Sequence, residues 1–273
     1  MEQTNSLIID GLERSYELFV PSSESKAIVI VLHGGGSNGK RMSKYTNFVE
    51  LAKKDNFILV FPNSFGKNWN DGRKFLDSNI DDVKFISKII DQLNNKFDID
   101  TKKVYVTGIS NGALMCFKLA YEIPEKITAI APVEGALSEE LYKSNFKLKI
   151  PLLMMNGTKD PIVKYDGGQI DFFSQKRGKI LSVEDAFNFW GDKNNCDKKF
   201  DIEQLPDIKN DGTKVFKLEK KNCDKKVILY KIESGGHTWA GATEFNFMQE
   251  YLVGKTSYDI NANEVIWNFF KSL

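Results

Sequence analysis

Residues 104–117 read VYVTGISNGALMCF, and this stretch decides the fold class. Its first four residues are β-branched or aromatic, as is typical of a strand, and the apolar run from Ala113 onward favours a helix. Residues 108–112 between them form a G-x-S-x-G sequence, which in this setting presents a serine on a sharp strand-to-helix turn. Glycines leave room for such a turn, and the helix N-terminus directs N–H groups toward the serine. We therefore predict that Ser110 is a nucleophile; the competing interpretation is a Gly-rich turn with a serine N-cap.

Outward from this stretch, short apolar strands alternate with segments of helical apolar spacing. Such alternation implies crossover units and a mostly parallel central sheet flanked by helices, an α/β fold. We expect a single domain over 1–273, with a polar excursion around 192–226 that carries a small hairpin. The predicted strands are 14–20, 26–32, 57–61, 104–107, 127–133, 152–155 and 227–232, and the predicted helices are 41–54, 82–97, 113–121, 182–190 and 263–270.

Composition narrows the function classes. The 273 residues carry a formal net charge of +1, with scattered lysines, so no global field favours nucleic acid or an anionic membrane. No apolar run approaches the roughly 20 residues of a membrane span. Residues 1–6 are polar and show no leader, so we expect either a cytoplasmic protein or a mature secreted one. We further expect a monomer.

Cysteine and histidine usage argues against a metal site. The chain has three cysteines without a C-x-x-C pair and only two histidines, a pattern that argues strongly against a structural zinc site. Cys116 lies in an apolar helical run and is expected to be a buried thiol. Cys196 and Cys223 lie in the polar excursion and could close one loop. We expect no metal and no organic cofactor.

A glycine loop precedes the serine turn. His33-Gly34-Gly35-Gly36 follows a predicted buried strand, and a hydrolase of this kind needs a second backbone N–H from such a loop to bind an oxyanion. We predict an oxyanion hole made by the N–H of Asn111 with that of Gly35 or Gly36. His33 itself is expected to be a structural hydrogen-bonding residue.

Two later loops supply an acid and a base. Asp160 follows the predicted strand 152–155, and its expected role is to fix the tautomer of a histidine; Asp166 is the nearest competitor. His237 follows the last strand in Gly235-Gly236-His237-Thr238-Trp239 and is the predicted general base. The chain order Ser110, Asp160, His237 is that of α/β-hydrolases.

Across nearly its whole length the chain resembles the esterase family that groups feruloyl and acetylxylan esterases with poly(3-hydroxybutyrate) depolymerases. The resemblance implies an α/β-hydrolase fold and ester hydrolysis. It also implies a disulfide before the catalytic histidine, where Cys196 and Cys223 match. Ala240 departs from the proline usual in the family. The resemblance rests on Arg14-Ser15-Tyr16-Glu17-Leu18, the glycine loop, Asp81-Asp82-Val83-Lys84-Phe85-Ile86, residues 104–112, Asn156-Gly157-Thr158-Lys159-Asp160, the histidine loop and Asp259-Ile260-Asn261-Ala262.

Two aromatic residues and two acids have open roles. Trp69 and Trp239 lie in loops expected near Ser110, where an indole could stack on a sugar or phenolic ring or simply pack the loop. Asp81 and Asp82 are expected to cap the helix that follows them.

These features favour a secreted serine carboxylesterase that acts through an acyl-enzyme on hydroxycinnamoyl (feruloyl) or acetyl esters of plant cell-wall polysaccharide. The expected partner is therefore a small ester or an ester-decorated polysaccharide. A polyhydroxybutyrate or other polyester depolymerase is the alternative within the same chemistry. A non-catalytic binding protein on the same fold would be expected to have lost a triad residue or the glycine loop, and a peptidase usually needs a further recognition domain.

Overall fold

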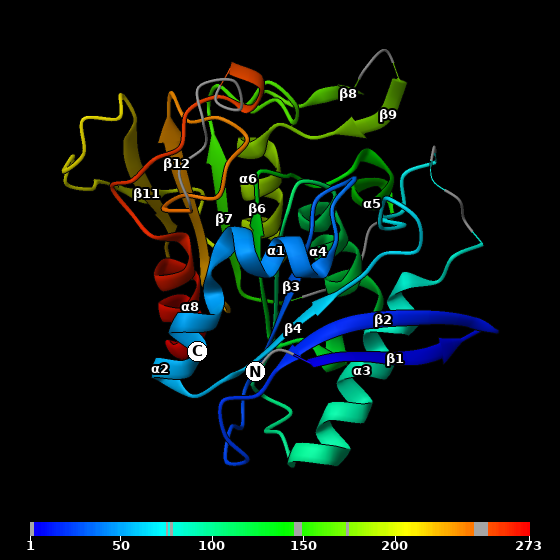
Figure 1. The fold of residues 1–273 in the computed structure, drawn as a ribbon. Helices are drawn as coiled ribbons and strands as arrows, with labels where there is room; N and C mark the ends of the chain where they lie inside the picture. The colour runs from blue at the N-terminus through cyan, green and yellow to red at the C-terminus, as the bar shows by residue number, and fades with distance from the viewer. Residues whose placement is uncertain (1–2, 75, 77–78, 145–148, 173–174, 243–250) are drawn as a thin grey trace.

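A ten-stranded sheet runs through the molecule in the order β1-β2-β4-β3-β5-β6-β7-β12-β11-β10 (Figure 1). The computed structural model describes residues 3–74, 76, 79–144, 149–172, 175–242 and 251–273. The strands are β1 (Gln3–Ile9), β2 (Leu12–Phe19), β3 (Ile28–Leu32), β4 (Ile58–Pro62), β5 (Val104–Ile109), β6 (Ala129–Val133), β7 (Leu152–Gly157), β10 (Phe200–Gln204), β11 (Lys214–Lys220) and β12 (Val227–Glu233), and a separate hairpin holds β8 (Gly168–Phe172) and β9 (Gln175–Ile180).

The centre of the sheet is parallel and its edges are antiparallel. Strands β4, β3, β5, β6, β7 and β12 pair in parallel, while β1 and β2 at one edge and β10 and β11 at the other pair antiparallel. This arrangement confirms the predicted mostly parallel sheet. The predicted hairpin of the excursion is β10–β11, and it extends the main sheet because β11 pairs with β12.

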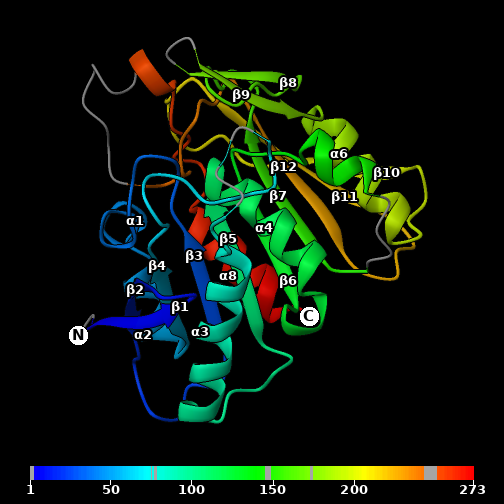
Figure 2. The ribbon, with the colours of Figure 1, turned by 90° about the vertical axis from the view of Figure 1, so that its right-hand side faces the viewer.

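Helices cover both faces of the sheet (Figure 2). Strand β3 shows why: Ile28 and Ile30 pack into one core with residues of α3, α4 and α6, and Val29 and Val31 pack into another with α1, α2 and α8. A strand buried on both faces must be apolar at every position. The helices are α1 (Gly39–Thr46), α2 (Phe48–Asp55), α3 (Asp82–Phe97), α4 (Asn111–Glu122), α5 (Glu139–Lys143), α6 (Val183–Lys193) and α8 (Ala262–Lys271), with a 3₁₀ turn η1 at Pro124–Lys126.

The predicted helix 41–54 is two helices, α1 and α2. Asn47 separates them with a left-handed backbone (φ 50°), and its N–H bonds to the carbonyl of Ser43. Asparagine adopts this conformation more readily than most residues, so apolar spacing alone did not reveal the break. Among the described residues, no helix combines the length and the apolar character that crossing a membrane requires.

Four connecting segments meet where the parallel strands end. They follow β3, β5, β7 and β12, and they carry the glycine loop, Ser110, Asp160 and His237. Parallel strands point the same way, so their carboxyl ends share one edge, and ligands in such sheets bind outside that edge. In Figure 1 this edge lies toward the top, below the β8–β9 hairpin.

Candidate active site

The serine turn has the geometry of an elbow. Ser110 joins β5 directly to α4 with φ 59° and ψ −121°, a backbone conformation that a non-glycine residue holds only under strain. A Cβ at Gly108 would lie 2.7 Å from the carbonyl oxygen of Leu32, and one at Gly112 only 2.5 Å from the same atom. Both glycines are therefore required by the close approach of β3. The Ser110 side chain makes no capping hydrogen bond to α4, which speaks against the simple N-cap interpretation.

Asp160 and His237 form a buried pair beside the serine. The Nδ1 atom of His237 lies 2.6 Å from Oδ2 of Asp160, and both Ser110 and His237 line one cavity. Oδ1 of Asp160 accepts the N–H groups of Ile162 and Val163 at 2.7 and 2.8 Å. The carboxylate is therefore held by three donors, with its side chain fully buried and that of His237 only 10% exposed. The competitor Asp166 does not line this cavity.

A third acid, Glu134, lies behind this pair and was missed in the sequence. It follows β6, and its Oε2 accepts the N–H of Gly157 at 2.9 Å. Burial, together with the negative charge of Asp160, raises the pKa of Glu134 well above its usual range. The sequence did carry a signal for Glu134, because this acid directly follows a predicted buried strand. The same signal identified Asp160.

Glu134, Asp160 and His237 place possible ligating atoms within 4.8 Å of one another. A metal ion would need His237 to release Asp160 and Glu134 to release the Gly157 N–H, since these atoms already share hydrogen bonds. The arrangement suits proton transfer better than metal binding, because His237 and Asp160 are already hydrogen-bonded to each other and ligands must be free of such bonds.

Gly35 and Gly36 of the glycine loop are the two predicted backbone donors to an oxyanion, and the structure distinguishes between them. The N–H of Gly36 donates to the carbonyl of Lys67 at 2.7 Å, and Gly36 does not line the cavity. Gly35 lines the cavity, and none of the hydrogen bonds among the described residues uses its N–H. The prediction is thus corrected for Gly36, because backbone pairing with a neighbouring loop consumes its donor. Gly35 and Asn111 remain the candidate oxyanion donors.

The side chain of Asn111 is fixed by a second buried network that the sequence did not reveal. Its Oδ1 accepts the N–H of Trp69 at 2.6 Å, and its Nδ2 donates to Oδ2 of Asp71 at 2.7 Å. Asp71 also receives the guanidinium of Arg73, with Nη2 at 2.6 Å and Nε at 2.9 and 3.0 Å from its oxygens. Arg73 in turn donates to the carbonyl of Arg177 in β9 at 2.6 Å. This network ties the oxyanion side of the site to the β8–β9 hairpin.

The cavity has a volume of about 340 Å³, and more of its wall is apolar than polar. Three arginines line it, and among the described residues it is lined by no lysine and no acid. The lining residues are Gly34, Gly35, Ser37, Arg41, Met42, Tyr45, Asn68, Arg73, Ile109, Ser110, Asn111, Leu114, Ile162, Val163, Ile170, Arg177 and His237.

The two tryptophans predicted to bind substrate do not reach this cavity. Trp69 is 0% exposed, and its Nε1 donates to the carbonyl of His33 at 2.9 Å. Trp239 is 1% exposed, and its Nε1 donates to Oδ1 of Asn263 at 2.9 Å. The expectation that they stack on a ring of the substrate is wrong, because both indoles pack the loops that carry the site. Their burial was the alternative that the sequence left open.

His33 has the structural role that the sequence predicts. Its Nε2 accepts the N–H of Ser64 at 3.1 Å, so its Nδ1 carries the proton and donates to the carbonyl of Gly34 at 2.8 Å. Burial lowers the pKa of His33 to about 4, so the ring stays neutral. These two hydrogen bonds of the neutral ring hold the glycine loop in place.

The two acids before α3 divide their roles. Asp81 caps the helix, as predicted, by accepting the N–H of Lys84 at 2.8 Å. Asp82 is not a cap: it is buried, forms an ion pair with Arg14 at 2.5 Å and accepts the N–H of Asn70 at 2.6 Å. This carboxylate anchors the loop that leads to Trp69.

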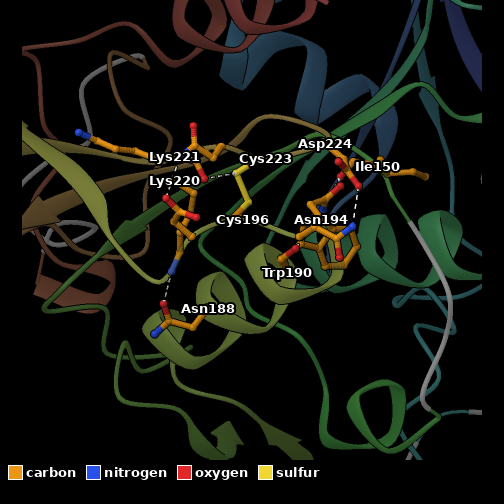
Figure 3. The surroundings of a disulfide bond; sticks show 12 residues. Ile150, Asn188, Trp190, Asn194, Cys196, Lys220, Lys221, Cys223 and Asp224 are labelled. Carbon is orange, nitrogen blue, oxygen red and sulfur yellow. Dashed lines mark hydrogen bonds between the residues drawn. A yellow bond between two sulfur atoms is a disulfide. The ribbon is translucent and has the colours of Figure 1, made fainter.

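Cys196 and Cys223 form a disulfide, and Cys116 is buried and free (Figure 3). The bridge joins the segment after α6 to the turn before β12, across 27 positions of sequence. Beside it, Trp190 and Asn194 donate to the carbonyl of Ile150 at 2.8 and 3.3 Å. Closing a loop of this length stabilises a fold by roughly 3 kcal/mol, largely through the unfolded chain.

Comparison with known proteins identifies the family of this chain. Residues 15–172 match the phospholipase/carboxylesterase family, a segment that includes Ser110 and Asp160 and ends before His237. The chain is 24% identical over 279 residues to the putative esterase NocK of Nocardia uniformis subsp. tsuyamanensis, covering 96% of this chain and 80% of that protein.

Two fungal relatives have informative names. The bifunctional acetylxylan esterase/xylanase XynS20E of Neocallimastix patriciarum is 25% identical over 85% of this chain, and feruloyl esterase B of Piromyces equi is 26% identical over 74%. The chain spans only about a third of their lengths, 32% and 38%.

An acetyl xylan esterase from Aspergillus awamori shares the fold, with a TM-score of 0.60 and 15% identity over 86% of this chain and 94% of that one. The match of more than half of the sequence is decisive for the family. The chain belongs to the phospholipase/carboxylesterase family, a family of carboxylic ester hydrolases on the α/β-hydrolase fold.

Proposed function

We propose that this protein is a serine carboxylesterase that removes feruloyl or acetyl groups from plant cell-wall polysaccharide. One observation carries the proposal: His237 bonds to the buried Asp160 and shares a cavity with Ser110 on its elbow. The relatives named acetylxylan esterase and feruloyl esterase support the substrate class. The disulfide supports secretion, since such bonds persist in oxidising compartments.

The first half of the reaction forms an acyl-enzyme. His237 takes the proton of Ser110 as its Oγ attacks the ester carbonyl, and Asp160 stabilises the resulting imidazolium. The developing oxyanion accepts the backbone N–H groups of Asn111 and Gly35. The C–O bond to the alcohol then breaks, and His237 gives its proton to the departing oxygen.

The second half releases the acid. Water enters, His237 removes one of its protons, and the oxygen attacks the acyl carbonyl in the same oxyanion site. The bond to Ser110 breaks, Ser110 recovers its proton from His237, and the carboxylic acid leaves. All groups needed for both halves belong to this chain.

A hydrolysis panel tests the substrate class. The substrates are methyl ferulate, acetylated xylan, short p-nitrophenyl esters and a polyhydroxybutyrate suspension, with Ser110→Ala as the matched blank. We expect turnover of the first three, with methyl ferulate or acetylated xylan preferred. Release of hydroxybutyrate as the main activity would replace this proposal with the depolymerase function. No turnover of any substrate above the Ser110→Ala blank would refute a serine esterase.

A further inference from the structure

Two uncharged polar side chains, those of Ser37 and Asn68, line the cavity of Ser110 beside the glycine loop. Neither side chain has a hydrogen bond to another described residue, and the polar atoms of both reach solvent. A hydroxyl and an amide can each donate and accept hydrogen bonds. Both side chains are therefore available to a ligand in the cavity.

Backbone hydrogen bonds hold Ser37 and Asn68 on adjoining segments of the wall. The N–H of Gly36 donates to the carbonyl of Lys67 at 2.7 Å. These two residues directly precede Ser37 and Asn68 in the chain. The residue after Asn68 donates its N–H to Oδ1 of Asn111 at 2.6 Å. The segment that carries Asn68 is thus fixed to both sides of the candidate oxyanion site.

The amide of Asn68 lies close to the reacting atoms. A Cβ added to Gly35, the candidate oxyanion donor, would lie 2.6 Å from Oδ1 of Asn68. A Cβ added to the neighbouring Gly34 would lie 3.4 Å from Cβ of Ser110. An ester bound at Ser110 therefore brings the atoms next to its carbonyl into the neighbourhood of this amide.

The cavity has an apolar interior and a polar opening. Buried apolar residues line the interior, namely Met42, Ile109, Leu114, Val163 and Ile170. Gly35, Gly36 and Lys67 are exposed, so Ser37 and Asn68 lie where the cavity meets solvent. A polysaccharide chain is too large for a cavity of about 340 Å³. Its sugar unit, which is the alcohol of the ester, must therefore stay at this opening while the acyl group enters.

From this placement we infer that Asn68 and Ser37 form a subsite for a hydroxyl group on the alcohol side of the ester. The favoured substrate is an ester whose alcohol carries a free hydroxyl next to the ester group, as an acetylated sugar unit does. The inference rests on the proposed esterase function and specifies its alcohol. Uncharged groups that donate and accept suit a hydroxyl, which does both. An analogue without the hydroxyl leaves them unpaired and is disfavoured.

Matched esters test the inference. Ethylene glycol monoacetate carries the hydroxyl on the alcohol side, and n-propyl acetate has a methyl group in its place. Ethyl glycolate and ethyl propionate make the same exchange on the acyl side. Each kcat/KM is divided by the alkaline hydrolysis rate of the same ester, which removes differences in intrinsic reactivity. We expect a preference for ethylene glycol monoacetate over n-propyl acetate of about 2- to 13-fold, as one neutral hydrogen bond supplies. Ethyl glycolate should not be preferred.

Variants identify the groups responsible. Asn68→Leu replaces the amide with an apolar side chain of similar size and should bring the alcohol-side ratio toward one, and Asn68→Ala is the second variant at this position. Ser37→Ala should lower the ratio by a smaller factor, because the amide remains. The controls Lys67→Ala and Lys40→Ala remove exposed side chains near the two residues but outside the cavity lining, and they should leave the ratio unchanged. Thermal melting checks that each variant is folded.

The outcomes separate this inference from the proposed function. If the two residues only hold their loops in place, the Asn68 variants slow both alcohol-side esters equally, and the unchanged ratio overturns the inference. A preference for ethyl glycolate that Asn68→Leu abolishes would move the hydroxyl to the acyl side and overturn it as well. Equal hydrolysis of both alcohol-side esters by wild type overturns it and leaves the esterase proposal intact. Hydrolysis of no ester in either pair also overturns it, and a negative panel above then ends the esterase proposal too.

Discussion

Two buried acid–base pairs reach the cavity, and only one can exchange a proton. Asp160 holds His237, and Asp71 holds Arg73. An imidazole can take up and release a proton near neutral pH, whereas a guanidinium stays charged throughout that range. The first pair can therefore carry the chemistry, while the second can only fix positions. An aspartate can thus take part in proton transfer or only hold the structure in place, and the basic residue bonded to it decides which.

The largest expected effect comes from removing the atoms that react. Ser110→Ala and His237→Ala should each lower kcat on the order of 10⁴-fold or more, and the double variant should lose little beyond either single one, because triad members act as a unit. The measurement is kcat on a p-nitrophenyl ester, with circular dichroism as the folding control. Additive losses in the double variant would show that the two residues do not work together.

The active pair also predicts a difference between two nearby acids. Asp160→Asn should reduce kcat on the order of 10⁴-fold, because the amide favours the wrong tautomer of His237. Asp166→Asn should cost far less, since Asp166 does not line the cavity. Steady-state kinetics of the two variants decide the assignment. Reversed magnitudes would make Asp166 the triad acid.

The scaffolding pair should matter more for stability than for chemistry. Asp71→Asn leaves the buried Arg73 charge without its carboxylate, which should lower the free energy of unfolding by about 3–5 kcal/mol. Looser placement of Asn111 should lower kcat by at most the 10²- to 10³-fold typical of losing one oxyanion donor. Urea unfolding and kinetics measure the two effects. The control is Asp98→Asn, because the ion pair of Asp98 with Lys26 is exposed and its loss should leave the free energy of unfolding nearly unchanged. A loss of activity as large as that of Asp160→Asn would erase the distinction between the pairs.

Glu134, which lies behind the Asp160–His237 pair, should make the free energy of unfolding depend on pH. Its pKa is raised in the folded protein, so between the unfolded value near 4.3 and the folded value the native state binds the extra proton. The free energy of unfolding of wild type therefore falls as pH rises through this window, by up to about 1.4 kcal/mol per unit. Gln at this position does not titrate.

The stability of Glu134→Gln relative to wild type should accordingly increase from pH 5 to pH 7. Urea unfolding at several pH values measures the difference, with Glu233→Gln at the exposed end of β12 as the control. A difference that stays constant with pH would mean that Glu134 is charged in the folded protein.

The local sequence was sufficient to predict those parts of the site whose geometry depends on one contiguous segment. The strand, elbow and helix around Ser110 are contiguous, and the G-x-S-x-G pattern of residues 108–112 predicts the sharp turn between them. The loops with Asp160 and His237 follow predicted buried strands, and parallel strands bring their carboxyl ends together. Helix α3 has the predicted bounds, because its apolar spacing and the Asp81 cap are both local signals. The parts of the site that follow single strands were therefore open to prediction.

Features that depend on a partner far away in sequence were decided only by the tertiary structure. The N–H of Gly36 is consumed by Lys67, and the indoles of Trp69 and Trp239 are buried by loops that pack on them. Arg41 and Arg177 meet at one cavity from segments more than 130 positions apart, and nothing in either neighbourhood indicates the other. Periodicity and motifs report what a residue's neighbours in the chain require. Whether a donor is free, an aromatic ring buried or a charge close to another depends on which distant segments share the space, and the packed chain alone determines that.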